Sequence, residues 1–129
     1  MRPLEYRDYL ADLLKRTPDV QRVQVVEDGP HPFTLAATVA GRESRWQIIG
    51  QLAEGAKHDT PTAAVTAGPP AFTVAPVTAA ADSWLAGVIG ASEPADTERI
   101  NVWSTHEGKT SKGVTVFFHN GERAFVRLI

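Results

Sequence analysis

The segment from His106 to Thr110 most resembles a nucleotide-binding motif, because its Gly-Lys-Thr also occurs at the end of phosphate-binding loops. The complete motif requires a glycine five residues before Gly108, and Trp103 occupies that position. It also requires a helix after the loop, whereas the alternating residues that follow predict a strand. We therefore interpret this segment as a hairpin loop and expect no nucleotide cofactor.

Side chains for metal binding and nucleophilic catalysis are sparse. The four histidines are His31, His58, His106 and His119, and no two have the i, i+4 spacing of a helical metal site. His106 and His119 fall at opposite ends of a predicted hairpin, about 15–20 Å apart at about 3.4 Å per residue. Cysteine is absent, and the sequence Gly90-Ala91-Ser92-Glu93 lacks the second glycine of a nucleophile elbow. The sequence predicts no catalytic residue, no cofactor and no metal ligand, and we expect that the protein is not an enzyme.

Aromatic and basic side chains near the C-terminus are the strongest functional indication. Alternation along the predicted strands of residues 98–129 places on one face Arg99, Asn101, Trp103, Thr105, Thr115, Phe117, His119, Arg123, Phe125 and Arg127. Aromatic and arginine side chains are enriched at binding interfaces, and large apolar patches are rarely left bare. We expect Trp103, Phe117 and Phe125 to anchor a protein partner. We expect Arg99, Arg127 and His119 to add polar contacts.

Three different occupants could cover this aromatic face. Residues 54–77, which include Phe72, could fold across it within the same chain. A second copy could stack on it and form a dimer, or a foreign protein could bind it. The position of residues 54–77 relative to Trp103 and Phe117 distinguishes the first of these from the others.

Two other functions use the same sequence features. Single-stranded nucleic acid could stack on the aromatic side chains and contact the arginines. Residues 98–129 carry five Lys and Arg against three Asp and Glu, whereas residues 1–97 carry eight against twelve, so the positive charge is concentrated near the C-terminus. Alternatively, a small-molecule enzyme or sensor could hold its ligand beneath residues 54–77, in a pocket gated by Phe72 and lined by His58 or His106.

These side chains must be positioned by helices and strands that recur in the same order. An amphipathic pattern predicts a first helix over residues 3–16, followed by strands at 20–27, 33–39 and 45–52. A second helix, capped by Thr78 and ended by Gly90, precedes strands at 98–106, 113–119 and 122–129. The recurrence indicates two units, 1–53 and 78–129, of one helix and three strands each.

An uncharged segment rich in proline, alanine and threonine connects the two units. Residues 60–81 are long enough to span a membrane, but they contain four prolines, which break helices. The first dozen residues include several charged side chains, unlike a secretory signal. We therefore expect a cytoplasmic protein without a membrane span, and the abundance of alanine and arginine is typical of a bacterium with a GC-rich genome.

The 129 residues fit a single domain of ordinary soluble composition, with 43% hydrophobic residues and a net charge of −2. This balance argues against a dedicated duplex-DNA-binding protein. We expect an α+β fold: a six-stranded, largely antiparallel sheet built from the two helix-strand-strand-strand repeats, with both helices on one face. The last hairpin needs a three-residue loop with Gly121 in the left-handed conformation, because a two-residue loop would place arginines among the apolar side chains. Within this fold we predict a protein-binding module of an adaptor, secretion-chaperone-like or immunity-like kind.

Overall fold

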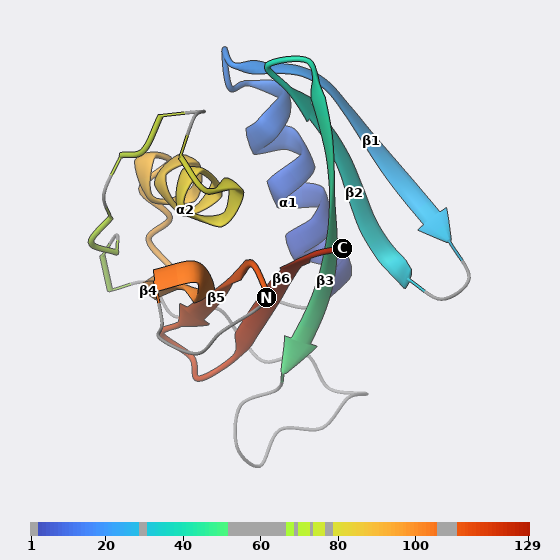
Figure 1. The fold of residues 1–129 in the computed structure, drawn as a ribbon. Coiled ribbons are helices and arrows are strands. Elements are labelled where there is room, and N and C mark those ends of the chain that lie inside the picture. The colour runs from blue at the N-terminus through green and yellow to red at the C-terminus, as the bar shows by residue number, and fades with distance from the viewer. Residues whose placement is uncertain are drawn as a thin grey trace.

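Six strands form one antiparallel sheet in the order β1-β2-β3-β6-β5-β4, as seen in the computed structural model (Figure 1). The structure describes residues 3–28, 31–51, 67–68, 70–72, 74–76, 79–105 and 111–129. The elements in chain order are α1 (Pro3–Lys15), β1 (Val20–Asp28), β2 (His31–Val39), β3 (Arg42–Gln51), α2 (Ala81–Ala91), β4 (Thr97–Val102), a 3₁₀ helix η1 (Trp103–Thr105), β5 (Gly113–Phe118) and β6 (Arg123–Leu128).

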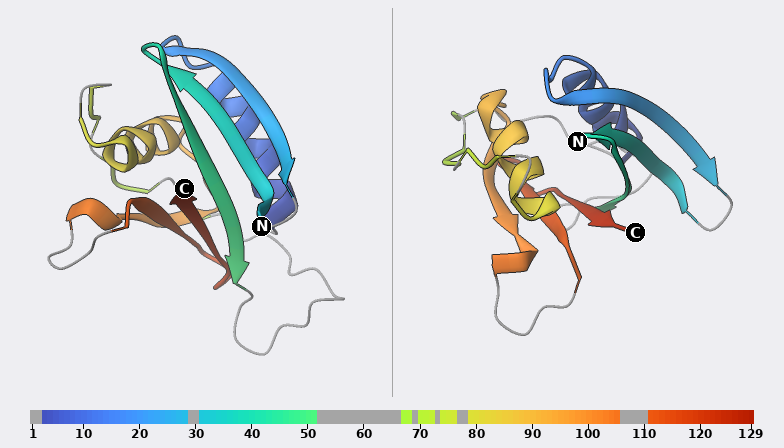
Figure 2. Two further views of the ribbon diagram at one scale, coloured as in Figure 1. Left: turned by 45° about the vertical axis from the view of Figure 1, so that its right-hand side comes forward. Right: turned by 45° about the horizontal axis from the view of Figure 1, so that its top comes forward.

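Both helices lie on the same side of the sheet, α1 against β1, β2 and β3 and α2 against β4 and β5 (Figure 2). The prediction of an α+β fold with a six-stranded antiparallel sheet is confirmed. The third strands of the two halves, β3 and β6, pair with each other, so the first strand of each half lies at an edge. The proposed duplication that would explain this arrangement stays a prediction.

One face of the sheet supplies the core. Strand register aligns Leu35 with Trp46, Ile48 with Val126, and Val126 with Val114. The helices cover these side chains with an apolar stripe that consists of Tyr6, Leu10, Leu13, Leu14, Trp84, Leu85 and Ile89. Complete burial of each large aliphatic side chain contributes roughly 1.5–3 kcal/mol. This shared core joins the two halves into one folded unit.

The β5–β6 hairpin has the predicted three-residue loop. Phe117 lies opposite Arg123, and the N–H of Phe118 donates to the carbonyl of Glu122 at 3.0 Å. Gly121 has a φ of +89°, in the region that favours glycine. This register keeps Val114, Val116 and Phe118 on the core face, as expected.

Two strands of the first half begin earlier than predicted. Ala40 and Gly41 form a two-residue turn with φ values of +51° and +78°, so β3 starts at Arg42 rather than at residue 45. Strand β2 starts at His31 and includes Pro32, which lies at a register irregularity and beyond the pairing with β3. This position is compatible with proline because a ladder hydrogen bond is not required there.

The boundaries of α2 also differ from the prediction. Its N-cap is Ala80, which makes no side-chain capping hydrogen bond, and Thr78 lies outside the described residues. Gly90 lies inside the helix, which continues to Ala91, so its role as a terminator was wrongly predicted. A Cβ built at Gly90 would overlap the side chain of Phe72, so the glycine permits Phe72 to lie directly on the helix.

The phenol of Tyr6 is buried between α1 and β5. Its ring lies 5.6 Å from that of Tyr9 and 5.7 Å from that of Phe118, measured between centroids. Its hydroxyl meets no hydrogen-bond partner among the described residues. Burial raises the pKa of Tyr6 well above its ordinary value, and the nearby Tyr9 and Asp96 raise it further.

We predict that Tyr6→Phe stabilises the fold increasingly above pH 10, relative to wild type. In the unfolded chain Tyr6 ionises near its ordinary pKa of 10.0, but in the folded chain it stays protonated. Ionisation therefore favours unfolding as the pH rises through 10, and phenylalanine removes this effect. Urea denaturation of both proteins between about pH 8 and about pH 11 measures the difference. A difference in unfolding free energy that stays constant across this range would contradict the burial of the phenol.

Candidate functional site

The outer face of β3, β6, β5 and β4 is the face opposite the helices, and strand register defines its residues. Arg99, Phe117 and Arg123 form one row across three strands. The next row consists of Asn101, Thr115, Phe125 and Ile49, and the third contains Gly113, Arg127 and Gln47. The sheet therefore brings together four of the six predicted binding residues, which are Arg99, Phe117, Phe125 and Arg127, and Trp103 joins them from η1 as described below.

Two guanidinium groups lie over the ring of Phe117. The Cζ atom of Arg99 is 4.0 Å from the ring centroid and that of Arg123 is 5.0 Å away. Cation–π contacts of this kind contribute about 0.5–1 kcal/mol at exposed sites. Phe117 is only partly buried, and the two arginines orient their charges above it.

Trp103 reaches this face from η1 and not from a strand, because β4 ends at Val102. The indole Nε1 donates to the Thr115 hydroxyl at 2.8 Å. A Cβ built at Gly113 would lie 2.8 Å from Cε3 of the indole and 2.6 Å from the carbonyl oxygen of Val126. The indole thus packs on the bare backbone of Gly113 and covers the middle of β5. The prediction that Trp103 and Thr105 belong to a strand was wrong.

A buried carboxylate fixes η1. Asp82 is fully buried in the first turn of α2. Its Oδ1 accepts from the Ser104 hydroxyl at 2.7 Å and from the N–H of Ser83 at 2.9 Å. Its Oδ2 accepts from the N–H of Ser104 at 2.9 Å and from the N–H of Gly113 at 3.2 Å. One side chain therefore ties α2, η1 and the start of β5 together, and thereby holds the indole of Trp103 on the outer face.

Ile49, from the first half of the chain, adds a fourth large apolar side chain to those of Trp103, Phe117 and Phe125. It lies opposite Phe125 in the β3–β6 ladder and is 44% exposed. The sequence analysis missed it because nothing in the local pattern indicates that β3 pairs with β6. With Ile49, the apolar side chains of the face come from three strands, β3, β6 and β5, and from η1.

His119 has a different environment from the one predicted. It lies in the β5–β6 turn, where its Nε2 is 3.1 Å from the carbonyl oxygen of Gly68. The N–H groups of Ala67 and Gly68 bond in turn to the carbonyl of Ala95. His119 thus holds the connecting segment against the α2–β4 loop.

The described part of the connecting segment lies on the α2 side of the molecule (Figure 1). Its Phe72 packs against Gly90 of α2. Trp103, Phe117 and Phe125 each keep part of their surface exposed. The other residues of the predicted cover, 54–66, 69, 73 and 77, lie outside the described residues. The described part of the chain therefore leaves this face open.

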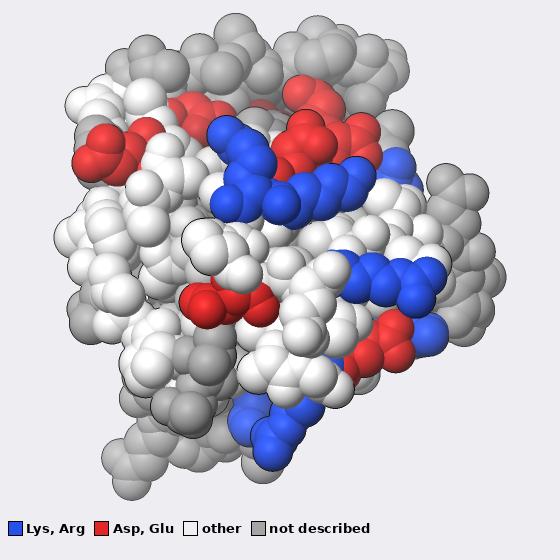
Figure 3. All heavy atoms as spheres, turned by 90° about the horizontal axis from the view of Figure 1, so that it is seen from above, with Lys and Arg blue, Asp and Glu red and all other residues white. Residues whose placement is uncertain are grey.

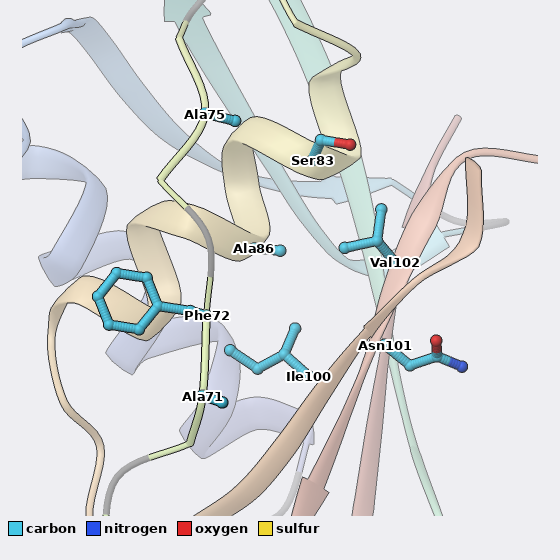
Figure 4. Close-up of a pocket in the computed structure, with 8 residues that line it drawn as sticks. All are labelled: Ala71, Phe72, Ala75, Ser83, Ala86, Ile100, Asn101 and Val102. Carbon is cyan, nitrogen blue, oxygen red and sulfur yellow. The ribbon is translucent and has the colours of Figure 1, made fainter. Parts of the chain in front are cut away.

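A groove of about 560 Å³ separates the connecting segment from α2 and β4 (Figure 4). Ala71 and Ala75 point into it, whereas the ring of Phe72 lies over α2 (Figure 4). The other residues that line it are Ser83, Ala86, Ile100, Asn101 and Val102. No described residue of the lining is titratable. His58 and His106, either of which would line the pocket in the enzyme or sensor alternative, lie outside the described residues.

Acidic and basic side chains are interspersed on the end of the molecule that Figure 3 shows, without a large patch of one sign. Among the described residues, no three histidine, aspartate or glutamate side chains are grouped as a metal site would require. No helix in the described ranges has the length and hydropathy needed to cross a membrane. Comparisons with protein-family models, with curated proteins and with solved structures gave no match.

We predict that Asp82→Ala lowers the free energy of unfolding by roughly 2–4 kcal/mol, because it removes the acceptor of four hydrogen bonds and leaves the buried N–H of Gly113 unpaired. Release of η1 also exposes the indole of Trp103, so its fluorescence should shift to longer wavelength. Trp46 and Trp84 are buried and should report no such shift while the protein stays folded. Replacement of both Trp46 and Trp84 by phenylalanine leaves Trp103 as the only tryptophan and isolates its signal.

Asp19→Asn is the matched control, because Asp19 is exposed and its substitution also removes one negative charge. It should leave both stability and fluorescence unchanged. Equal losses in the two variants would point to net charge and not to the hydrogen bonds of Asp82.

Proposed function

We propose that this chain is a non-enzymatic protein-binding module, an adaptor, secretion-chaperone-like or immunity-like protein acting in the cytoplasm. The outer face of β3, β6, β5 and β4 would bind the partner. The observation that carries the proposal is the group of four large apolar side chains on this face, which are Ile49, Trp103, Phe117 and Phe125. All four keep exposed surface, and the described part of the connecting segment lies elsewhere. A rigid apolar patch with a basic border is typical of a protein interface.

Single-stranded nucleic acid is the second candidate for this face, because the arginines could also contact phosphates. Base stacking needs open ring faces. Arg99 and Arg123 lie over Phe117, and Trp103 packs one side of its indole on Gly113. Two of the three aromatic rings are thus engaged within the protein, which favours a protein partner that packs around them.

A second copy of the chain is a less favourable partner. Face-to-face stacking of two sheets would bring Arg99, Arg123 and Arg127 of one copy toward the same residues of the other. Like charges facing each other across an interface are unfavourable by several kcal/mol. The proposal therefore favours a foreign protein over a homodimer.

The groove beside α2 gives weaker support to an enzyme or a small-molecule sensor. Its described lining is formed by small or aliphatic side chains together with Ser83 and Asn101. General acid–base catalysis needs a titratable group within hydrogen-bonding reach of the substrate. We therefore place the function on the outer face.

Photo-crosslinking in cells of the source organism tests the proposal. A benzophenone amino acid replaces Phe125 in one variant and Gln24 in the control. Gln24 is exposed and lies on the same side of the sheet in the first half, beside Ala36. We expect a covalent adduct with a foreign protein from position 125 and none from position 24.

The other outcomes identify the alternatives. An adduct with a second copy would favour self-association, and an adduct that nuclease removes would favour nucleic acid. Equal adducts from both positions, or no adduct at either, would contradict a binding role for this face.

A further inference from the structure

We infer that the partner is an acidic protein segment, one that carries a strip of apolar side chains with carboxylates on both sides. This inference rests on the proposed function, because it names the chemistry of what the outer face binds. It is carried by the arrangement of charge around the apolar side chains of that face.

The charge in the three rows around Phe125 has a single sign. Arg99, Arg123 and Arg127 are exposed, and none of them forms an ion pair with a described residue. The other described positions of the three rows around Phe125 carry no carboxylate, since they are Gln47, Ile49, Gln51, Asn101, Gly113, Thr115, Phe117 and Phe125. Glu43 lies further along β3 on the same face, beyond the residues that pair with β6, and it forms an ion pair with Arg45 at 3.9 Å. Glu122 precedes Arg123 in the sequence, but it is buried in the β5–β6 turn, where it forms hydrogen bonds with Asn120. These rows therefore present three positive charges that no carboxylate of the same rows compensates.

The large apolar side chains of the face, Ile49, Trp103, Phe117 and Phe125, form an apolar strip, and positive charges lie on both sides of Phe125 within it. On β6, Phe125 lies between Arg123 and Arg127, which are about 14 Å apart at about 3.4 Å per residue. Arg99 lies two strands away from Arg123 in the same row, about 10 Å distant at about 4.8 Å per strand. An apolar side chain that packs on Phe125 would therefore have an arginine about 7 Å to either side along β6.

This spacing sets the pattern that the partner must match. In an extended segment, residues i, i+2 and i+4 point to one side and span about 14 Å. An acidic residue at i, an apolar residue at i+2 and an acidic residue at i+4 would thus lie over Arg123, Phe125 and Arg127. Guanidinium groups bind carboxylates through two parallel hydrogen bonds, which gives this pairing directional specificity.

Desolvation and charge repulsion disfavour an entirely apolar partner and a basic partner. An entirely apolar partner would cover the three guanidinium groups without pairing them, at a cost of several kcal/mol. A basic partner would be repelled on approach. An acidic and apolar segment gains from both components of the face.

Selection from a library of random displayed peptides tests the inference. Wild-type protein is the target, and counter-selection uses Phe125→Ser, which removes the central apolar side chain. Ile49→Ser provides a second counter-selection variant on the neighbouring strand. Both residues lie on the outer face, so circular dichroism and thermal denaturation should report folded proteins. We expect the enriched peptides to combine Asp or Glu with aliphatic or aromatic residues at alternate positions.

Synthetic copies of the enriched peptides then give affinities by titration calorimetry. The double variant Arg123→Gln/Arg127→Gln should weaken binding about tenfold or more, and increasing salt from about 50 mM to about 500 mM should weaken binding to wild type. Arg22→Gln, an exposed arginine in the first half, is the matched control and should bind like wild type. A peptide with its acids replaced by lysine should prefer Arg123→Glu/Arg127→Glu over wild type.

The outcomes separate this inference from the proposed function. Peptides that need Phe125 but contain no acidic excess, and that bind Arg123→Gln/Arg127→Gln as well as wild type, would overturn the inference and leave the proposed function intact. Enrichment that is equal for wild type and Phe125→Ser would overturn both. A mixed single-stranded oligonucleotide that binds wild type but not Phe125→Ser, while no peptide does so, would also overturn both and assign the arginines to phosphates.

Discussion

The pairing of β3 with β6 is the contact on which the rest of the structure depends. It joins the last strand of each half, so that Trp46 and Ile48 of one half lie beside Leu128 and Val126 of the other. Each half alone would expose its apolar sheet face at this junction. The ladder makes that face continuous, and the two helices cover it together. The same ladder aligns Ile49 with Phe125 and thus makes the outer apolar strip continuous as well.

The outer face is held rigid by groups that lie behind it. The carboxylate of Asp82 extends from α2 to η1 and β5, and the hydrogen bond from Trp103 to Thr115 then holds the indole against the sheet. Arg99 and Arg123 are oriented by the ring of Phe117. A binding surface that is ordered before contact loses less conformational entropy on binding than a mobile one. Recognition on this face would thus depend on side chains that are already in place.

Patterns of short range were sufficient to predict much of this fold. Alternation along residues 113–129 predicted which side chains face the core, and the conflict between Asn120-Gly121 and that alternation predicted the three-residue loop. Long-range contacts were not predictable in the same way. Asp82 was not singled out, because its partners Ser104 and Gly113 are 22 and 31 residues away. Gly90 has the character of a helix terminator in sequence, and only the approach of Phe72 explains its place inside α2.

The contacts around η1 also constrain how this sequence can diverge. Asp82 supplies the acceptor for the backbone of Gly113, and Gly113 supplies the flat surface on which Trp103 lies. A larger residue at position 113 would require a smaller one at 103, and loss of the carboxylate at 82 would require a different loop after β4. Relatives of this protein should therefore replace positions 82, 103 and 113 together or keep all three. Such covariation would indicate that relatives keep the same outer face even where overall sequence identity is low.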